Sequence, residues 1–161
     1  MYHIKVLELT REKFSPYGQV VEVPASGHPT IDVETVKFWK QQAIYSTGEK
    51  TEIGVLMVRQ QEMIFEELEN HFKTPTILLC LDGDFILPVA PPSDDVPSSS
   101  EVVAFRVQKN QMVILAEKCW HGVAYPADKE EITLLVIFRE NSLDDDTVFE
   151  PLDDKCTVVT N

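Results

Sequence analysis

Short runs of apolar and β-branched residues, broken at regular intervals by turn-forming residues, make up most of this chain. Val, Ile, Thr, Phe and Tyr are dense in these runs, and this composition is typical of β-strands. Strands are predicted over residues 19–23, 36–45, 53–59, 76–89 (with a turn at 82–84), 101–107, 112–115 and 132–139. So many short strands favour an all-β sandwich or barrel over alternating strands and helices.

Helical signals are few. Thr10 can cap a short helix near the N-terminus, which Pro16 and Gly18 would soon end. The Pro-, Ser- and Asp-rich stretch 88–100 predicts an exposed loop, because proline interrupts the pairing of strands.

The composition changes after Arg139. Residues 140–155 contain seven acidic residues and one Lys, with few apolar residues among them. We therefore expect a single β-barrel domain over residues 1–140. Over residues 141–161 we expect an acidic C-terminal tail that packs on the barrel or extends from it.

The segment around Leu68 has two interpretations. Ile64, Leu68 and Phe72 recur every four residues, which is typical of an amphipathic helix. In a strand, the same segment would place Glu69 and His71 on one face, because side chains alternate along a strand. The periodicity by itself favours the helix, and the two interpretations group different polar residues.

The overall composition is that of one folded domain with a strong negative charge. The chain has 161 residues, of which 43% are hydrophobic, enough for a self-sufficient core. Its 27 Asp and Glu against 14 Lys and Arg give a net charge of −13. Nucleic acids and anionic membranes also carry negative charge, so neither is expected as a partner. No apolar run approaches the roughly 20 residues of a membrane-spanning helix.

The cysteines and the N-terminus bear on the compartment. Three cysteines at spacings that form no CxxC pair argue against a disulfide framework. The first 14 residues carry charges throughout, which predicts no secretion signal. We expect a cytoplasmic protein.

Four histidines are present, and two of them suit a metal site. His71 lies among carboxylates, and His121 opens a turn of small residues. Together with Glu69 they would offer two imidazoles and one carboxylate to a divalent metal ion, with positions left open for substrate. These three residues are too far apart in the sequence to form a metal-binding motif by themselves. A single histidine in either setting more often has a structural role than a catalytic one. His3, near the N-terminus, and His28, in a loop, are expected to be idle.

Arg59 ends an apolar strand and has two interpretations. Its guanidinium group is either a surface cation or binds a substrate carboxylate through paired hydrogen bonds. Cys119 is expected to be a buried bystander rather than a nucleophile, because no base is identifiable beside it. The glycine-rich nucleotide-binding motifs and the common hydrolase motifs are absent from the sequence, so no nucleotide cofactor is expected.

Several segments, taken in order, resemble one family. The run LTREKFSPYGQVVE at 9–22 resembles the opening of the ureidoglycolate lyase family, and ELENH at 67–71 is similar to a family segment that also ends in histidine. The stretches that follow in the family's order are LDGDF (81–85), FRV (105–107), QMV (111–113), CWH (119–121) and the strand ending at Arg139. The resemblance covers most of residues 5–140.

This family is similar to the cupins, which are double-stranded β-helix barrels of the jelly-roll type. The resemblance therefore implies that residues 66–72 form a strand, against the periodicity. It also implies that Glu69, His71 and His121 face one cavity, where they bind a divalent metal ion or act as catalytic acid and base.

The resemblance also implies a reaction and its substrate contacts. Ureidoglycolate lyases split (S)-ureidoglycolate into glyoxylate and urea in the breakdown of allantoin and purines. In chemical terms, a base takes the hydroxyl proton while the departing nitrogen is protonated. Arg59 would hold the carboxylate as a catalytic residue, and Thr76 and Trp120 would also contact the substrate.

Two other functions remain open. One is a cupin enzyme that acts on another small hydroxy- or keto-acid, and the other is a cupin that binds a small molecule without catalysis. A homodimer is expected by resemblance, because cupins pair through sheet edges and exchanged N-terminal strands. The β-rich N-terminal run, which would otherwise leave an exposed sheet edge, agrees with this.

Four positions depart from the family's pattern. The family has a histidine where this chain has Glu66, and a glutamine where it has Thr76. The second histidine of the family's WHH is Gly122, and the aspartate of its terminal DR is Phe138. These departures leave the barrel unchanged and bear on the reaction, because function resides in the site rather than in the fold.

Overall fold

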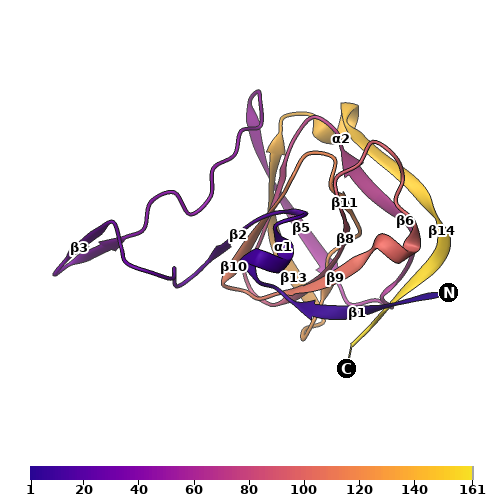
Figure 1. Ribbon diagram of the computed structural model, residues 1–161, viewed down its shortest axis with the longest axis horizontal. Helices are drawn as coiled ribbons and strands as arrows, with labels where there is room; N and C mark the ends of the chain where they lie inside the picture. The colour runs from indigo at the N-terminus through magenta and orange to yellow at the C-terminus, as the bar shows by residue number, and fades with distance from the viewer. Residues whose placement is uncertain (161) are drawn as a thin grey trace.

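β-Strands make up almost all of the regular structure in the computed structural model, which describes residues 1–160 (Figure 1). The strands are β1 (Tyr2–Glu8), β2 (Gly18–Glu22), β3 (Ile31–Val33), β4 (Val36–Phe38), β5 (Thr51–Arg59), β6 (Ile64–His71), β7 (Thr76–Cys80), β8 (Phe85–Ala90), β9 (Val103–Val107), β10 (Gln111–Leu115), β11 (Trp120–His121), β12 (Tyr125–Pro126), β13 (Glu131–Arg139) and β14 (Thr147–Val159). The helical elements are α1 (Arg11–Phe14), the 3₁₀ turn η1 (Ser99–Glu101) and α2 (Ser142–Asp145).

Six strands follow one another around a closed ring, in the order β6, β14, β1, β9, β8 and β11. β11 closes the ring because it pairs with β6 on one side and with β8 on the other. β1 runs parallel to both of its neighbours, whereas the other pairs are antiparallel. The short strand β12 extends this sheet from β8.

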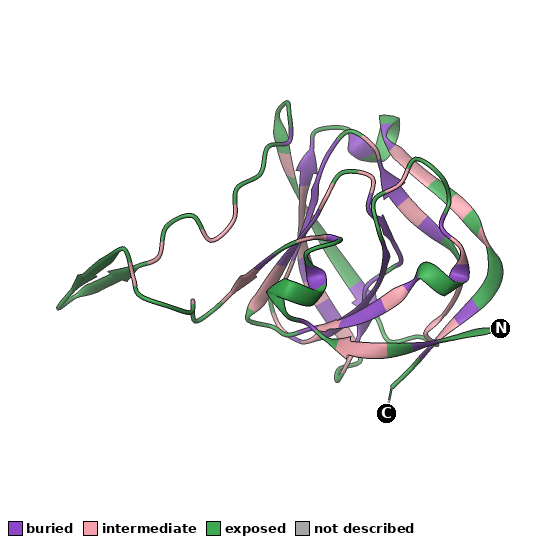
Figure 2. Cartoon of the chain, in the orientation of Figure 1, coloured by how far each residue is buried: buried purple, intermediate pink, exposed green. Residues whose placement is uncertain are grey.

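A second, antiparallel sheet of five strands, β2-β10-β7-β13-β5, faces the ring. One apolar core lies inside the ring around Leu68 and Trp120, and all six ring strands contribute to it. The other core lies between the ring and the second sheet, around Phe105 and Leu134 (Figure 2). The expected all-β fold of the jelly-roll type, with a short N-terminal helix, is confirmed.

The helices are short, and α1 forms where the sequence predicts it. The Thr10 Oγ1 atom accepts a hydrogen bond from the Lys13 backbone N–H at 3.1 Å, which caps the helix. Phe14 is fully buried and packs edge-on against Phe105, with ring centroids 5.3 Å apart, and Tyr17 joins this cluster. None of the helices in residues 1–160 is long and apolar enough to cross a membrane.

Residues 64–71 form the strand β6, so the helix predicted from the periodicity around Leu68 is wrong. Leu68 points into the core of the ring. Glu69 and His71 lie on the opposite face of the strand, toward the second sheet. Each side of the strand therefore has its own environment, and the strand pairing with β11 and β14 overrides the local pattern.

The segment expected to form an acidic tail contains α2 and the longest strand of the fold. β14 lies between β6 and β1, and Cys156 and Val158 point into the core of the ring. Alternate residues of a strand meet different surroundings, so an acidic outer side coexists with an apolar inner side. Composition averages the two sides and therefore hides the strand; Asn161 lies outside the described residues.

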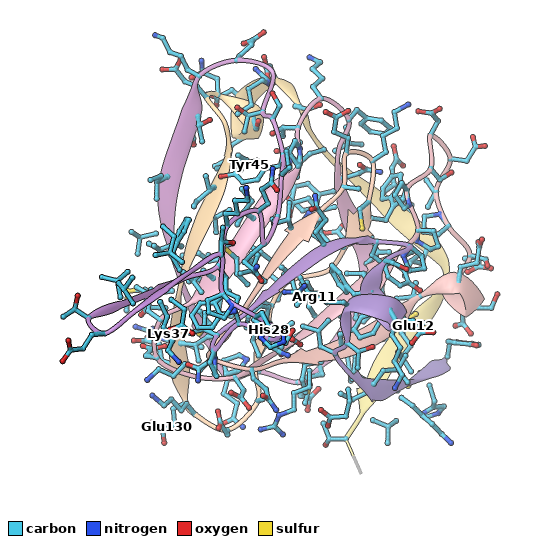
Figure 3. All side chains as sticks on the ribbon, turned by 60° about the vertical axis from the view of Figure 1, so that its left-hand side comes forward. Arg11, Glu12, His28, Lys37, Tyr45 and Glu130 are labelled. Atoms are coloured by element: carbon cyan, nitrogen blue, oxygen red, sulfur yellow. The ribbon has the colours of Figure 1, made fainter. Side chains whose placement is uncertain are left out.

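Residues 24–46 form an extended arm that leaves the barrel between β2 and β5 (Figure 1). The strand predicted over 36–45 is confined to β4, which forms a hairpin with β3. No residue of the arm is buried (Figure 2). His28, Lys37 and Tyr45 mark its course in Figure 3. The loop predicted over 88–100 begins only after β8 ends at Ala90.

The aromatic cluster under α1 gives a first prediction. Replacement Phe105→Ala removes a fully buried ring that contacts both Phe14 and Tyr17. We expect the free energy of unfolding in urea to fall by about 3–5 kcal/mol, because the substitution leaves a cavity in the core. Phe149→Ala, at a ring that is 56% exposed, is the matched control and should change stability by less than about 1 kcal/mol. Equal losses in the two variants would contradict the packing described.

Candidate active site

Glu69, His71 and His121 come together on the face of β6 and β11 that looks toward the second sheet. Glu69 and His121 are direct partners across the two strands, and His71 lies two residues along β6 on the same face. The His71 Nε2 atom lies 3.2 Å from Glu69 Oε1, and the His121 Nδ1 atom lies 4.0 Å from Glu69 Oε2. The three side chains each offer one ligand atom within 4.8 Å of the others.

These three residues border a cavity of about 300 Å³ between the ring and the second sheet. Its wall is mostly apolar and comes from β5, β7, β13, the loop after β11, and α2. The polar side chains of its lining are Glu52, Glu69, His71, Thr76 and His121. Among the described residues, no Lys or Arg lines it. A cavity of this size and character suits a small metabolite held by a few polar groups.

A short chain of hydrogen bonds sets the tautomer of His71. The Thr147 hydroxyl donates its proton to the Ser142 carbonyl at 2.9 Å. Its oxygen, 3.3 Å from His71 Nδ1, is then left to accept a proton from that nitrogen. A neutral His71 therefore carries its proton on Nδ1 and turns the lone pair of Nε2 toward Glu69, as metal-binding histidines with an outer hydrogen-bond partner do.

This arrangement fits a bound cation. The lone pair of His71 Nε2 faces Glu69 Oε1, and the buried Nε2 atom of His121 has no hydrogen-bond partner. Two ligand atoms on one ion at about 2.1 Å each lie roughly 3.0–3.4 Å apart, close to the spacing of the Glu69 and His71 atoms. The donor set of two imidazoles and one carboxylate is one that binds divalent transition metals and leaves further positions open. The residues present can therefore hold such an ion.

Burial controls the charges of this group. Desolvation lowers the pKa of His121 from 6.5 to about 4, and the neighbouring His71 acts in the same direction, whereas Glu69 opposes the shift. Burial would raise the pKa of Glu69, but the hydrogen bond from His71 and the charges of both histidines lower it overall. At neutral pH, His121 is uncharged and Glu69 is ionised.

Three of the four departures from the family's pattern lie on the cavity wall. Thr76, Gly122 and Phe138 all line it. The Thr76 hydroxyl is buried and has no partner in the protein, so it is free to bind a ligand. A side chain at Gly122 would meet Pro88 at 3.3 Å, so the wall is tight at this point. Glu66 instead lies on the surface, where it pairs with Lys155.

Two of the residues expected at the site lie elsewhere. The side chain of Arg59 is 85% exposed and pairs with Glu131 on the surface, outside the cavity, so it is the surface cation of the two interpretations. Trp120 points the other way from His121, because neighbours alternate along β11. Its ring fills the core of the ring of strands, and its Nε1 atom donates to the Ser93 carbonyl at 3.2 Å. Neither residue contacts the cavity in this chain.

Thr147 is the residue at this site that the sequence gives no signal for. It lies at the start of β14, within the segment expected to form an acidic tail, and reaches His71 only through the pairing of β14 with β6. Cys119 is buried, and burial raises the pKa of its thiol well above the ordinary value. The interpretation of Cys119 as a bystander agrees with this.

The tautomer of His71 gives a second prediction. In Thr147→Val the hydroxyl that accepts the Nδ1 proton is replaced by a methyl group of similar size. We expect the affinity of the EDTA-treated protein for Mn²⁺ or Zn²⁺, measured by calorimetric titration, to fall about 10- to 100-fold. Thr157→Val, also on β14 but opposite Ile64 at the other end of its pairing with β6, is the control and should bind as the wild type does. Unchanged binding in Thr147→Val would contradict this role of Thr147.

The charge states give a third prediction, on stability against pH. Because the pKa of His121 is lower in the folded chain than in the unfolded chain, the unfolded chain gains a proton as the pH falls from about 6.5 to about 4 and the folded chain does not. Unfolding is therefore favoured across this window, by up to about 3 kcal/mol from this residue. The lowered pKa of Glu69 adds a loss of the same sign at lower pH.

Urea titrations in EDTA at about pH 7 and about pH 4.5 measure this effect. His121→Gln should flatten the loss of stability between the two values, whereas His28→Gln, on the exposed arm, should leave it unchanged. Parallel pH profiles for the wild type and His121→Gln would show that His121 takes up its proton equally in both states.

Comparison with known proteins places the chain in a family. The family model for ureidoglycolate lyase matches residues 1–158. A ureidoglycolate lyase of Pseudomonas putida (strain F1) is 29% identical over 147 residues, which are 88% of this chain and 87% of that protein. A ureidoglycolate lyase of Pseudomonas aeruginosa (strain PAO1) is 26% identical over 88% of this chain and 86% of that protein.

Among solved structures, a Bacillus subtilis oxalate decarboxylase is similar over 68% of this chain and 26% of its own, longer chain, with 18% identity and a TM-score of 0.44. We draw no argument from this likeness. The match to the family model runs through both sheets, the three converging side chains and β14. This chain belongs to the ureidoglycolate lyase family.

Proposed function

We propose that this protein cleaves ureidoglycolate to glyoxylate and urea. The observation that carries the proposal is the buried group of Glu69, His71 and His121, which borders a cavity of metabolite size in a chain of this family. The curated relatives named above are ureidoglycolate lyases over nearly their whole length. The site offers what such a reaction needs, namely a base, a hydroxyl donor and a mostly apolar wall.

The reaction is an elimination without any change of oxidation state. The hydroxyl O–H bond breaks, and its electron pair forms the C=O bond of glyoxylate. The C–N bond breaks, and its electron pair stays on the ureido nitrogen, which takes up one proton. The proton lost by oxygen equals the proton gained by nitrogen, so one group that accepts and then returns a proton completes the cycle.

Neutral His121 and ionised Glu69 are the groups that can perform this transfer. Each has a free lone pair at neutral pH, and they lie 4.0 Å apart on paired strands. Thr147 fixes the ring of His71, which places its Nε2 atom 3.2 Å from Glu69 Oε1. If a divalent ion instead takes up the lone pairs of these three side chains, it would supply a Lewis acid for the hydroxyl and carboxylate oxygens of the substrate.

The substrate carboxylate needs a partner other than Arg59. Among the described residues, the cavity lining holds no Lys or Arg. Thr76 contributes an unpaired hydroxyl that can donate to a carboxylate oxygen. Apolar side chains of the lining, including the buried Phe138, lower the polarity around such contacts and so strengthen them.

A second function, a related enzyme of another small hydroxy- or keto-acid, has one observation in its favour. Thr76, Gly122 and Phe138 replace three polar residues of the family's pattern, and all three line the cavity. The change makes the wall less polar, with smaller side chains at Thr76 and Gly122 and a larger one at Phe138. A cupin that binds a small molecule without catalysis is the remaining alternative.

We also propose that the protein works in the cytoplasm. Cys80, Cys119 and Cys156 are all buried and unpaired. Free thiols are typical of proteins in reducing compartments.

The function is tested by measuring urea and glyoxylate released from racemic ureidoglycolate, with and without added Mn²⁺. We expect the two products in equal amounts from the wild type. We expect His121→Ala to lower kcat/KM by at least ~100-fold, because a proton-transfer group is lost. Arg59→Ala should have a kcat/KM close to that of the wild type, because the Arg59 side chain lies outside the cavity.

The other outcomes separate the alternatives. A protein that binds metal and turns over other hydroxy- or keto-acids, but releases no urea, would favour the second function. A protein that binds no metal and turns over none of these acids would favour a binding role. A large loss of kcat/KM in Arg59→Ala would show that Arg59 does act at the site.

A further inference from the structure

Glu52 brings a second carboxylate to the active-site cavity, on the wall that the second sheet provides. It lies on β5, and its partner across the strands is Phe138 of β13. Residues that pair directly in an antiparallel sheet point to the same face. Phe138 is buried, lines the cavity and packs against the ring of His71, with ring centroids 5.9 Å apart. The partly buried side chain of Glu52 therefore stands on the cavity side of β5.

One oxygen of the Glu52 carboxylate is held in place and the other is available. The Oε2 atom accepts a hydrogen bond from the Asn141 backbone N–H at 3.0 Å, at the start of α2. Within residues 1–160, the Oε1 atom has neither a hydrogen bond nor an ion pair. An ionised carboxylate only accepts hydrogen bonds and has about four positions for them. Glu52 therefore offers a fixed acceptor to a hydrogen-bond donor in the cavity.

Thr76 and Glu52 lie on either side of Phe138 in the second sheet. The strand order is β7, β13, β5, and the registers place these three residues in one row across the sheet. Neighbouring strands are about 4.8 Å apart, so the backbones of Thr76 and Glu52 are roughly 10 Å apart. Ureidoglycolate measures about 5 Å from its carboxylate carbon to its terminal nitrogen. With a hydrogen bond of about 3 Å at each end, it spans such a row.

Ureidoglycolate has a group that suits each end of this row. Its carboxylate accepts hydrogen bonds, which the unpaired Thr76 hydroxyl can donate, and its ureido group carries N–H donors. We propose that Glu52 binds the terminal NH₂ of the ureido group and so sets the direction in which the substrate lies. This inference rests on the proposed function. The reversed direction is disfavoured, because it would bring the substrate carboxylate against the carboxylate of Glu52.

This direction brings the reacting bonds to the three converging side chains. The carbinol carbon lies between the carboxylate and the ureido group, and therefore over Phe138, whose ring packs against His71. Two carboxylates and, among the described residues, no Lys or Arg line the cavity, which favours hydrogen-bond donors over a second anion at the β5 end. Glu52 is thus a specificity-determining residue, which selects an acid with an amide NH₂ over one with a methyl group in its place.

Two unreactive ligands of nearly equal size test this contact without any turnover. N-Carbamoylglycine carries the ureido group and the carboxylate but lacks the hydroxyl, and N-acetylglycine has a methyl group in place of the terminal NH₂. By calorimetric titration, we expect the wild type to bind N-carbamoylglycine at least ~10-fold more tightly, because only this ligand can donate to the charged Glu52 carboxylate. In Glu52→Gln this preference should fall by at least ~5-fold.

The choice of variant separates this contact from a structural role of Glu52. Glutamine keeps an oxygen that can accept the Asn141 N–H, so α2 stays anchored, but it turns an NH₂ instead of an acceptor toward the cavity. Damage to α2 would weaken the binding of both ligands equally and leave the preference unchanged. Glu34→Gln, in the exposed turn of the arm hairpin, is the control and should keep the wild-type preference. With ureidoglycolate, Glu52→Gln should raise KM by about 10-fold and lower kcat far less.

The outcomes distinguish this contact from the proposed function. A wild type that binds neither ligand, or binds both equally, would overturn the contact, and so would an unchanged preference in Glu52→Gln. Urea release from ureidoglycolate together with one of these results would support the proposed function and overturn the role of Glu52. A wild type that releases no urea, but prefers N-carbamoylglycine through Glu52, would contradict the proposed function and support the contact.

Discussion

The strands β6 and β11 separate the core of the ring from the active-site cavity, and the rest of the structure depends on this constraint. On one face they must carry Leu68 and Trp120 into the core of the ring. On the other face they must carry Glu69, His71 and His121 toward the second sheet. A shift of one residue in the pairing would exchange the two faces, placing three polar groups in an apolar core. Stability of the ring and geometry of the site are therefore set by the same register.

The three polar groups are themselves stable only as a set. A buried carboxylate or imidazole that lacks a partner is unfavourable in an apolar wall. Here Glu69 lies close to both imidazoles, and Ser142 of α2 and Thr147 of β14 complete the arrangement by fixing the ring of His71. The Nε2 atoms of His71 and His121 keep unmatched lone pairs, and an ion or a proton would bind there.

The sequence allows much of this fold and part of this site to be predicted, for physical reasons. Apolar runs and turns predict strands because they reflect local geometry. Around Leu68, however, the local period favours a helix, and only the family resemblance implies the strand that groups Glu69 with His71. The pairing of β14 with β6 depends on residues far apart in the chain, so Thr147 has no local signal. Arg59 ends a strand as expected, but only the twist and position of β5 decide that its side chain faces solvent.

The parallel pairing of β1 with β14 has a consequence for how the chain folds. β14 follows all the other strands along the chain, yet it is the neighbour of β1 in the ring, and the N-terminal amine lies 3.0 Å from Asp154. The ring cannot close before β14 is available, and until then one edge of β1 is unpaired. Nor can His71 acquire its partner Thr147 before then. The active site of a nascent chain is thus assembled last, by the strand that completes the barrel.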